Sequence, residues 1–160
     1  MNFRIGNGYD VHALAEELPF WLGGVRIDHT KGCVAHSDGD VAIHALCDAL
    51  LGAAALGDIG KHFPDTSVEY KNIDSKILLA LTVGLLRVAG YEIGNVDVTI
   101  CLQQPKIKDF ISEMERVLAM VMRVEAGQVS VKATTTEKLG FVGREEGVAA
   151  YATALIFREQ

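Results

Sequence analysis

Apolar residues recur at helical spacing in three stretches of the chain, and each stretch is bounded by residues that start or stop helices. Residues 38–51 predict a first helix with Ser37 or Asp38 as its N-cap. Residues 74–89 predict a second helix, and residues 107–124 predict a third. The sequence therefore predicts three amphipathic helices.

The other apolar stretches alternate with polar residues or are broken by glycine, which is typical of strands. Residues 3–6 predict a short first strand, and residues 21–27 predict a second that bends at its two glycines. Alternation is clearest at residues 96–102, and further strands are predicted at residues 129–133 and 148–157. Strands and helices thus alternate through most of the chain.

This alternation favours an α+β fold in which one sheet carries helices packed on one face. The last strand is rich in small residues and poor in charge, and the face without helices must be hidden too. Both points are consistent with subunits that pack their sheets around a common axis. With 160 residues, of which 49% are hydrophobic, the chain is expected to form a single domain, 1–160.

Composition limits the partners and the compartment. A formal net charge of −6 and a pI near 5.3 disfavour nonspecific binding to nucleic acids and anionic membranes, because both require a cationic surface. The N-terminus shows no charged-then-apolar signal and no apolar stretch reaches membrane-spanning length, so a cytoplasmic location is expected. Cys33, Cys47 and Cys101 show no C-x-x-C spacing, which predicts reduced thiols.

A candidate metal site begins with Asp10 and His12, which are two apart in an extended segment and so point to the same side. His44 in the first helix would supply a third ligand. Three such ligands leave the fourth tetrahedral position open, as in catalytic zinc sites. The alternative is a turn aspartate, a packed histidine and an unrelated helix histidine. Asp48 is either an acceptor for the non-ligating ring N–H of His44 or a solvated carboxylate.

Three polar segments are candidates for contact with a ligand. His36 and Ser37 precede the first helix, whose free N–H groups favour anions, although Ser37 can also be a simple cap. Residues 134–138 combine hydroxyls, a carboxylate and an ammonium, which suits a phosphate with Mg²⁺; a polar exit from a strand is the alternative. Residues 57–67 form a long polar loop of the kind that contacts ligands.

The glycine-rich segment 139–147 is not a nucleotide-binding loop of the Walker A or G-x-G-x-x-G type. A turn in which Arg144 pairs with a carboxylate is the favoured interpretation. The segment therefore gives no independent indication of a nucleotide.

Several sequence blocks carry a family resemblance that covers nearly the whole chain. They are Gly8–His12, Ala35–Asp40 with His44, Leu56–Gly60, Phe63–Thr66, Gly94–Asp97, Pro105–Lys106 and Val131–Phe141. In these blocks the chain resembles the 2-C-methyl-D-erythritol 2,4-cyclodiphosphate synthases, the cyclases of the non-mevalonate isoprenoid pathway. Several blocks in one order are far more specific than any single motif.

The resemblance implies two metal ions. Asp10, His12 and His44 match the ligands of one zinc ion per subunit, and Glu137 matches the ligand of a second ion, Mg²⁺ or Mn²⁺, that bridges the substrate phosphates. Two residues match catalytic groups that stabilise the transition state, and these are His36 and Thr135.

The resemblance also implies a substrate site with a methylerythritol part and a cytidine diphosphate part. The matching residues are Asp10, His12, His36, Ser37, Asp58, Ile59, Gly60, Phe63, Pro64, Asp65, Thr66, Ser67, Leu102, Gln103, Gln104, Pro105, Lys106, Ile107, Lys108, Thr134, Thr135, Thr136, Glu137, Phe141 and Arg144. Of these, Asp58, Gly60, Phe63, Asp65 and Ser67 match the methylerythritol part, and residues 102–108 and 134–137 match the cytidine diphosphate part. Ser67 stands where relatives can carry an acidic residue, and Gln104 stands where a smaller residue is common. These two departures affect substrate contacts and leave the metal ligands unchanged.

The implied assembly is a homotrimer with active sites between neighbouring subunits and sheets that face the common axis. Phe141, Arg144 and Glu146 match positions that line a central cavity on that axis, for which an isoprenoid diphosphate is a candidate ligand. This match competes with the interpretation of Arg144 as part of a simple turn.

The implied reaction cyclises 4-diphosphocytidyl-2-C-methyl-D-erythritol 2-phosphate to 2-C-methyl-D-erythritol 2,4-cyclodiphosphate with release of CMP. This is phosphorus–oxygen lyase chemistry in isoprenoid precursor biosynthesis. Two rivals stay open at this point. One is a zinc phosphohydrolase, whose open metal position activates water. The other is a trimeric protein that binds isoprenoid phosphates and has a purely structural metal.

Overall fold

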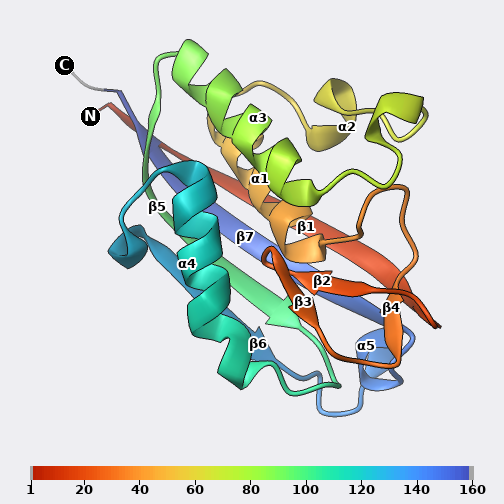
Figure 1. Ribbon diagram of the computed structural model, residues 1–160. Helices are drawn as coiled ribbons and strands as arrows, with labels where there is room; N and C mark the ends of the chain where they lie inside the picture. The colour runs from red at the N-terminus through yellow and green to blue at the C-terminus, as the bar shows by residue number, and fades with distance from the viewer. Residues whose placement is uncertain (1, 159–160) are drawn as a thin grey trace.

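The structure is a computed structural model that describes residues 2–158, and its centre is a twisted five-stranded sheet (Figure 1). The strand order is β4-β1-β7-β5-β6, with β5 and β6 parallel and the other neighbours antiparallel. The strands are β1 (Phe3–Glu16), β4 (Lys31–Cys33), β5 (Glu92–Cys101), β6 (Val129–Thr134) and β7 (Gly147–Phe157). A separate hairpin consists of β2 (Phe20–Leu22) and β3 (Val25–Ile27).

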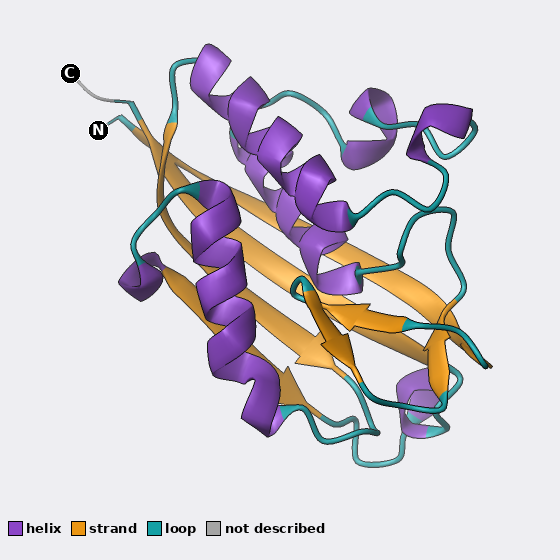
Figure 2. Cartoon of the chain, in the orientation of Figure 1, coloured by secondary structure: helices purple, strands orange, loops and turns teal. Residues whose placement is uncertain are grey.

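Helices cover one face of the sheet, as the sequence predicts (Figure 2). The long helices are α1 (Val41–Ala53), α3 (Ser75–Val88) and α4 (Ile111–Met122). The shorter ones are α2 (Ile59–His62), α5 (Gly140–Gly143) and the 3₁₀ turns η1 (Val68–Tyr70), η2 (Lys108–Phe110) and η3 (Ala126–Gln128). Helix α1 packs directly on β1 and β7, α4 packs on β6, and α3 packs on both helices. No helix within residues 2–158 is long and apolar enough to span a membrane.

The first strand is longer than predicted. Local sequence predicts a strand at residues 3–6, whereas β1 continues to Glu16. The reason is tertiary: β1 pairs with β7 from Phe3 to Ala13 without interruption, which outweighs the weak strand preference of glycine and asparagine. Asp10 therefore lies inside a paired strand and not after one.

The predicted cap of the first helix is also wrong. Helix α1 begins at Val41, and Asp40 is its N-cap in place of Ser37 or Asp38. The carboxylate of Asp38 is engaged elsewhere, because it accepts the backbone N–H of Ser75 at the start of α3 at 2.9 Å. Long-range contacts decide which of three plausible capping residues is used.

Asp40 is fully buried and joins the start of α1 to the β2–β3 turn. Its carboxylate accepts the backbone N–H of Ile43 at 3.1 Å, and also those of Gly23 at 2.9 Å and Gly24 at 2.7 Å in the β2–β3 turn. Burial raises the pKa of Asp40, while the hydrogen bonds from the backbone oppose that rise. This carboxylate fixes the start of α1, and His44 lies one turn further along the helix.

Two glycines let β1 approach α1 closely. A Cβ atom on Gly8 would lie 1.9 Å from the carbonyl oxygen of Ala45, and one on Gly6 would lie 1.9 Å from that of Ala49. Real side chains never come this close to a backbone atom, so only glycine fits at these positions. The approach brings the helix residue His44 next to the ligands on β1.

The opposite face of the sheet carries exposed apolar side chains. Phe3, Ile5, Tyr9 and Val11 on β1 are between 41% and 65% exposed, and Tyr151 on β7 is 49% exposed. The ring centroids of Tyr9 and Tyr151 are 4.9 Å apart. Exposed apolar groups gathered on one sheet face are typical of a surface that another chain covers.

Candidate metal centre and active site

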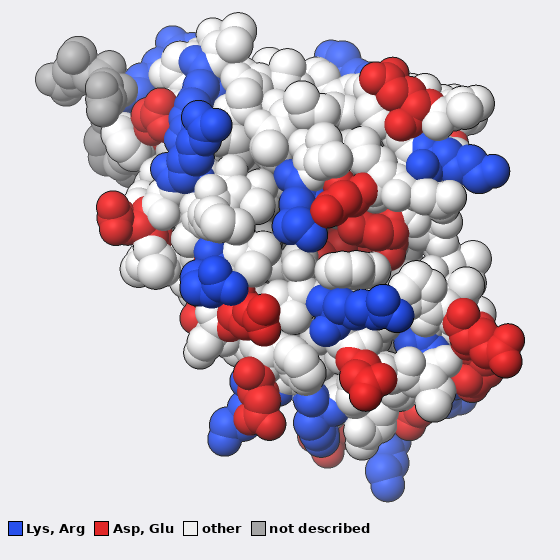
Figure 3. Space-filling view, viewed as in Figure 1, with Lys and Arg blue, Asp and Glu red and all other residues white. Residues whose placement is uncertain are grey.

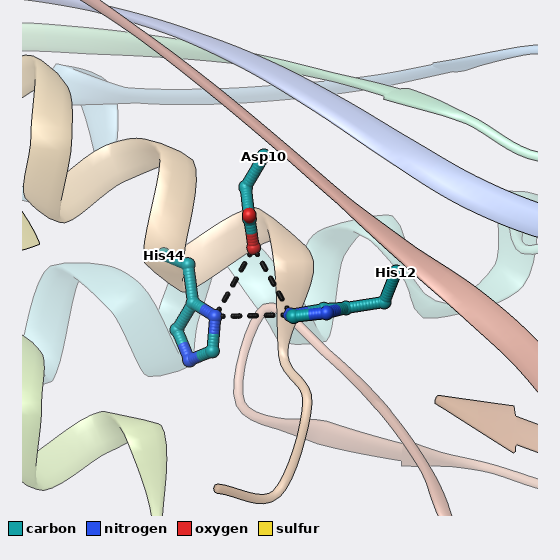
Figure 4. Close-up of side chains that lie close together, drawn as sticks. All are labelled: Asp10, His12 and His44. Carbon is teal, nitrogen blue, oxygen red and sulfur yellow. Dashed lines mark hydrogen bonds and ion pairs between the residues drawn. The ribbon is translucent and has the colours of Figure 1, made fainter. Parts of the chain in front are cut away.

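Three side chains meet at one point, as the sequence predicts (Figure 4). Asp10 and His12 project from β1, and His44 projects from α1. The Asp10 Oδ2, His12 Nε2 and His44 Nδ1 atoms are each 3.1 Å from the other two. All three side chains are largely buried, with exposed fractions between 12% and 27%.

This donor set fits a zinc ion. One carboxylate oxygen and two imidazole nitrogens are ligands that zinc accepts, with bonds of about 2.0–2.2 Å. In a tetrahedral site such bonds hold the ligand atoms roughly 3.3 Å apart, which is close to the 3.1 Å separations seen here. The three atoms are therefore already spaced for one ion, with a fourth position left for another ligand.

The same cluster shows mutual electrostatic stabilisation. Burial by itself raises the pKa of Asp10, but hydrogen bonds from His12 and His44 and their positive charge outweigh burial and lower it far below its usual range. Burial by itself lowers the pKa of His44, but the hydrogen bond to Asp10 and the nearby carboxylates outweigh burial and raise it. A divalent cation would replace this positive charge beside Asp10.

Of the two alternatives for Asp48, the one in which it supports the His44 ring is wrong. Asp48 accepts the backbone N–H of Ile59 at 2.7 Å and so holds the start of α2. The Nε2 atom of His44 instead lies 2.9 Å from the Ser75 Oγ atom and 3.2 Å from the Ser37 Oγ atom. The Nε2 atom of His44 therefore faces the start of α3, whereas the carboxylate of Asp48 is engaged with α2.

A cavity of about 420 Å³ opens beside the metal ligands. Most of its lining residues were predicted to contact the substrate. Its lining residues are His12, Ala35, His36, Ser37, His44, Ile59, Gly60, Phe63, Asp65, Tyr70, Ile73 and Leu78. Five predicted residues are absent from this lining, and these are Asp10, Asp58, Pro64, Thr66 and Ser67.

Local contacts shape the rim of this cavity. Asp58 is the N-cap of α2, and its side chain accepts the backbone N–H of Lys61 at 2.9 Å. The Nε2 atom of His36 lies 3.0 Å from the carbonyl oxygen of Ser67. His36 and Ser37 lie in the loop before α1 and not in its first turn, because the helix begins only at Val41. Their interpretation as groups at a helix N-terminus is therefore wrong, although both still line the cavity.

A second cavity of about 270 Å³ lies at the end of β5 and β6. It is lined by Leu102, Pro105, Lys106, Ile107, Lys108, Ile111, Ala133, Thr134 and Thr135. Seven of these residues were predicted at the cytidine diphosphate. Other predicted residues lie outside this lining, and these are Gln103, Gln104, Thr136 and Glu137. Lysine and hydroxyl groups beside apolar walls suit a nucleotide, whose phosphates need donors and whose base is flat.

The loop after β6 presents its polar groups to solvent. The Thr135 hydroxyl lies 3.3 Å from the Glu137 Oε1 atom and accepts the Glu137 backbone N–H at the same distance. Glu137 and Lys138 both adopt positive φ, at 53° and 64°. Such backbone strain at two consecutive residues is typical of functional loops.

The two cavities lie on different strands of one sheet. The metal ligands Asp10 and His12 lie on β1, whereas Thr134 ends β6, with β7 and β5 between them. Three strand spacings of about 4.8 Å separate β1 from β6 by roughly 14 Å. The cavities share no lining residue.

The segment after the loop forms the short helix α5 and then a turn at residues 144–146. Arg144 donates to Glu146 through two nitrogens, at 2.8 Å and 3.1 Å, and both side chains are exposed. The predicted pairing of Arg144 with a carboxylate is confirmed. Phe141 packs beside Gly147, and neither Phe141 nor Arg144 lines either cavity.

Sequence reasoning missed several contributors to the site. Tyr70, Ile73 and Leu78 complete the wall of the first cavity, and Ser75 contacts His44. In the sequence, Tyr70, Ile73 and Leu78 look like ordinary packing residues, and Ser75 looks like a residue that starts a helix. Only the folded arrangement places them beside the metal ligands.

Comparison with known proteins gives one family. The sequence profile of the YgbB family matches residues 3–157. The 2-C-methyl-D-erythritol 2,4-cyclodiphosphate synthase of Porphyromonas gingivalis is 62% identical over 154 residues, which cover 96% of this chain and 95% of that protein. The protein of the same name from Bacteroides fragilis is 60% identical over 158 residues, which cover 99% of each.

Solved structures give the same result. The bifunctional IspDF of Campylobacter jejuni has a TM-score of 0.95 and 45% identity, and the match covers 99% of this chain and 43% of that one. A complex of Plasmodium falciparum IspF with CDP has a TM-score of 0.87 and 34% identity, covering 99% and 98%. A CDP-bound 2C-methyl-D-erythritol-2,4-cyclodiphosphate synthase has a TM-score of 0.88 and 35% identity, covering 96% and 99%.

Proposed function

The chain belongs to the YgbB family, in which its relatives are 2-C-methyl-D-erythritol 2,4-cyclodiphosphate synthases, and we propose how its two cavities perform that reaction. The enzyme converts 4-diphosphocytidyl-2-C-methyl-D-erythritol 2-phosphate to the 2,4-cyclodiphosphate and CMP. The observation that carries the proposed roles of the two cavities is that a three-ligand cluster, Asp10, His12 and His44, lies beside a cavity of about 420 Å³. A cytoplasmic location is part of the proposal.

The reaction is intramolecular. An oxygen of the 2-phosphate forms a bond to the β-phosphorus of the diphosphate, and the bond from that phosphorus to the CMP oxygen breaks. CMP leaves with the bonding electron pair, so no serine or cysteine nucleophile is needed. The protein must fold a polyanion back on itself, and such positioning can contribute about 7–11 kcal/mol in favourable cases.

Asp10, His12 and His44 would hold zinc at the first cavity. When bound, the ion supplies positive charge that orients a phosphate oxygen and stabilises charge on it. His36 and Ser37 line the same cavity and can donate to phosphate oxygens. The apolar wall beside them, which includes Phe63, suits the methylerythritol carbon chain.

Glu137 would hold the second ion, Mg²⁺ or Mn²⁺, at the other cavity. Its carboxylate is an oxygen ligand of the type that these ions prefer, and it is exposed beside Thr135. Thr135 lines the cavity, and its hydroxyl would donate a hydrogen bond to a phosphate oxygen as charge develops. Lys106 and Lys108 lie on the same lining and offset the substrate charge.

A homotrimer would join the two cavities. They lie roughly 14 Å apart across one sheet, so a site between subunits can bring the metal centre of one chain to the cytidine cavity of its neighbour. The exposed apolar face that includes Tyr9 and Tyr151 would pack around the common axis. Sedimentation equilibrium would test this assembly, and a monomer at micromolar concentration would contradict it.

The segment that contains Phe141, Arg144 and Glu146 would line the central cavity on the trimer axis. An isoprenoid diphosphate is the proposed ligand, because a guanidinium can bind its phosphates and an aromatic ring its tail. Arg144 is already held by Glu146, so a ligand must share or displace that ion pair. Calorimetric titration of the protein with an isoprenoid diphosphate would detect this binding, and no heat above that of dilution would contradict it.

Glu137→Gln is expected to lower the rate of CMP release about tenfold or more and to raise the Mg²⁺ concentration needed for half of the maximal rate. The amide keeps the shape of the side chain but removes the charge that binds the ion, and tenfold corresponds to about 1.4 kcal/mol. Steady-state assays over a range of Mg²⁺ concentrations measure both effects.

The matched control is Glu113→Gln, which makes the same change on the exposed surface of α4. It is expected to leave both values unchanged. Wild-type rates and Mg²⁺ dependence in Glu137→Gln would remove Glu137 from the second metal site.

A further inference from the structure

A buried serine lies behind the metal ligand His44. Ser75 is the first residue of α3 and is fully buried. Its Oγ atom lies 2.9 Å from the Nε2 atom of His44, on the opposite side of the ring from the metal cluster. The same hydroxyl makes a short hydrogen bond to the carboxylate of Asp38.

The carboxylate of Asp38 fixes the direction of that hydrogen bond. An ionised carboxylate has acceptor sites and no donor, so the Ser75 hydroxyl must donate to it. Asp38 also accepts the backbone N–H of Ser75 at 2.9 Å and that of Asp40 at 3.1 Å. These three hydrogen bonds hold the carboxylate in place and commit the only proton of the Ser75 hydroxyl.

The Ser75 oxygen can therefore offer only lone pairs to His44. A contact of 2.9 Å between that oxygen and Nε2 then requires Nε2 to carry a proton. In neutral imidazole the other nitrogen, Nδ1, is left with a lone pair. Nδ1 is the atom that lies 3.1 Å from Asp10 Oδ2 and from His12 Nε2, where the ion would be bound.

We propose that Ser75, held by Asp38, is a positioning residue that fixes the tautomer and the ring orientation of His44 for metal binding. It acts through His44 and touches neither the ion nor the substrate. Asp38 lies in the loop before α1, and Ser75 lies at the start of α3. The relay formed by Asp38, Ser75 and His44 therefore also connects the metal centre to the arrangement of these two helices. The inference rests on the proposed metal role of Asp10, His12 and His44.

Ser37 is a neighbour of the same nitrogen but cannot replace Ser75. Its Oγ atom is further from Nε2, at 3.2 Å, and it accepts the backbone N–H of Gly39 at 3.2 Å. No carboxylate accepts the Ser37 proton within the part of the chain that the structure describes. Its hydroxyl can therefore rotate and either donate or accept, so it does not select one tautomer.

Two variants test the relay through the zinc affinity, measured by competition with a chelator. Ser75→Ala removes the acceptor, and the affinity is expected to fall about 10–100-fold, as for other partners of metal-ligating histidines. Asp38→Asn keeps the hydroxyl but lets it rotate toward Nε2, and a loss of at least fivefold is expected. Ser112→Ala, an exposed serine in the first turn of α4, is the matched control and should leave the affinity unchanged.

A spectroscopic measurement needs no substitution. In ¹⁵N NMR of the zinc-loaded wild-type protein, His44 is expected to show a protonated Nε2 whose hydrogen exchanges slowly with water. In Asp38→Asn that exchange should be much faster. A role of Ser75 in helix packing alone would lower the melting temperature without changing either signal.

The outcomes separate this inference from the proposed function. Wild-type zinc affinity in folded Ser75→Ala and Asp38→Asn, or an Nε2 without a proton in the wild type, would overturn the relay and leave the metal site standing. Failure of the wild-type protein to bind zinc would overturn both. If Ser75→Ala does not fold, Asp38→Asn and the wild-type spectrum decide.

Discussion

His44→Ala is expected to lower the rate of CMP release at least about 100-fold. Removal of one of three protein ligands abolishes tight zinc binding, and a bound metal ion contributes several kcal/mol of charge stabilisation, of which about 2.7 kcal/mol corresponds to 100-fold. The substitution also leaves Asp10 and His12 without the partner that lies 3.1 Å from each. Release of CMP and zinc content per chain should fall together.

The control for this variant is His29→Ala, which removes an imidazole that packs near Phe20, outside both cavities. It should retain zinc and activity. A fully active His44→Ala protein would remove the metal centre from the reaction. A variant without activity but with normal zinc content would assign His44 a role other than metal binding.

Gly8→Ala is expected to destabilise the protein by more than about 3 kcal/mol, beyond the usual cost of overpacking a core. The new Cβ atom would lie 1.9 Å from the carbonyl oxygen of Ala45 and 2.7 Å from the backbone nitrogen of Ala49. Both are main-chain atoms, so no side-chain rotation relieves the contact and α1 must move away from β1. Thermal unfolding should show a melting temperature lower by roughly 6–12 °C.

The same displacement should weaken the metal centre. Asp10 lies two residues after Gly8, and His44 directly precedes Ala45, so a shift between β1 and α1 separates the ligands. The matched control is Gly84→Ala in α3, where nothing lies within 4 Å of a new Cβ atom. That variant should be more stable by about 0.5–1 kcal/mol, because alanine favours a helix. Equal stability of the two variants would contradict the close packing of β1 on α1.

The three metal ligands could be predicted from the sequence because simple rules apply to them. Asp10 and His12 share a side of an extended segment through their spacing of two, and His44 is a metal-binding residue type on a predicted helix. The distance between strand and helix could not be predicted. It depends on Gly6 and Gly8, whose role appears only when the backbone of α1 lies against them.

The residues that support the site were harder to predict, because their partners are distant in sequence. A spacing of four made Asp48 one candidate for the partner of His44, yet Ser75, 31 residues from His44, takes that position. The N-cap was misplaced for a similar reason, since Asp40 is selected by contacts with Gly23 and Gly24. Local patterns identify candidate groups, and tertiary contacts decide which of them are used.

The residues that the family blocks assign to the two parts of the substrate fall largely into two separate cavities. Most residues assigned to the methylerythritol part line the first cavity, and most of those assigned to cytidine line the second. On the face seen in Figure 3, basic and acidic side chains are interspersed, so we expect the anionic substrate to depend on local donors within these cavities. The trimer that would join the cavities stays a prediction.

Phosphorus NMR of the purified protein with zinc, Mg²⁺ and 4-diphosphocytidyl-2-C-methyl-D-erythritol 2-phosphate tests the central claim most directly, because it reports turnover and product topology together. The predicted result is the loss of substrate signals and the appearance of equal amounts of CMP and a cyclic diphosphate with two coupled phosphorus atoms. A zinc phosphohydrolase would give CMP and a linear bisphosphate, and a binding protein would give no new signals. Either of these results would contradict the cyclase.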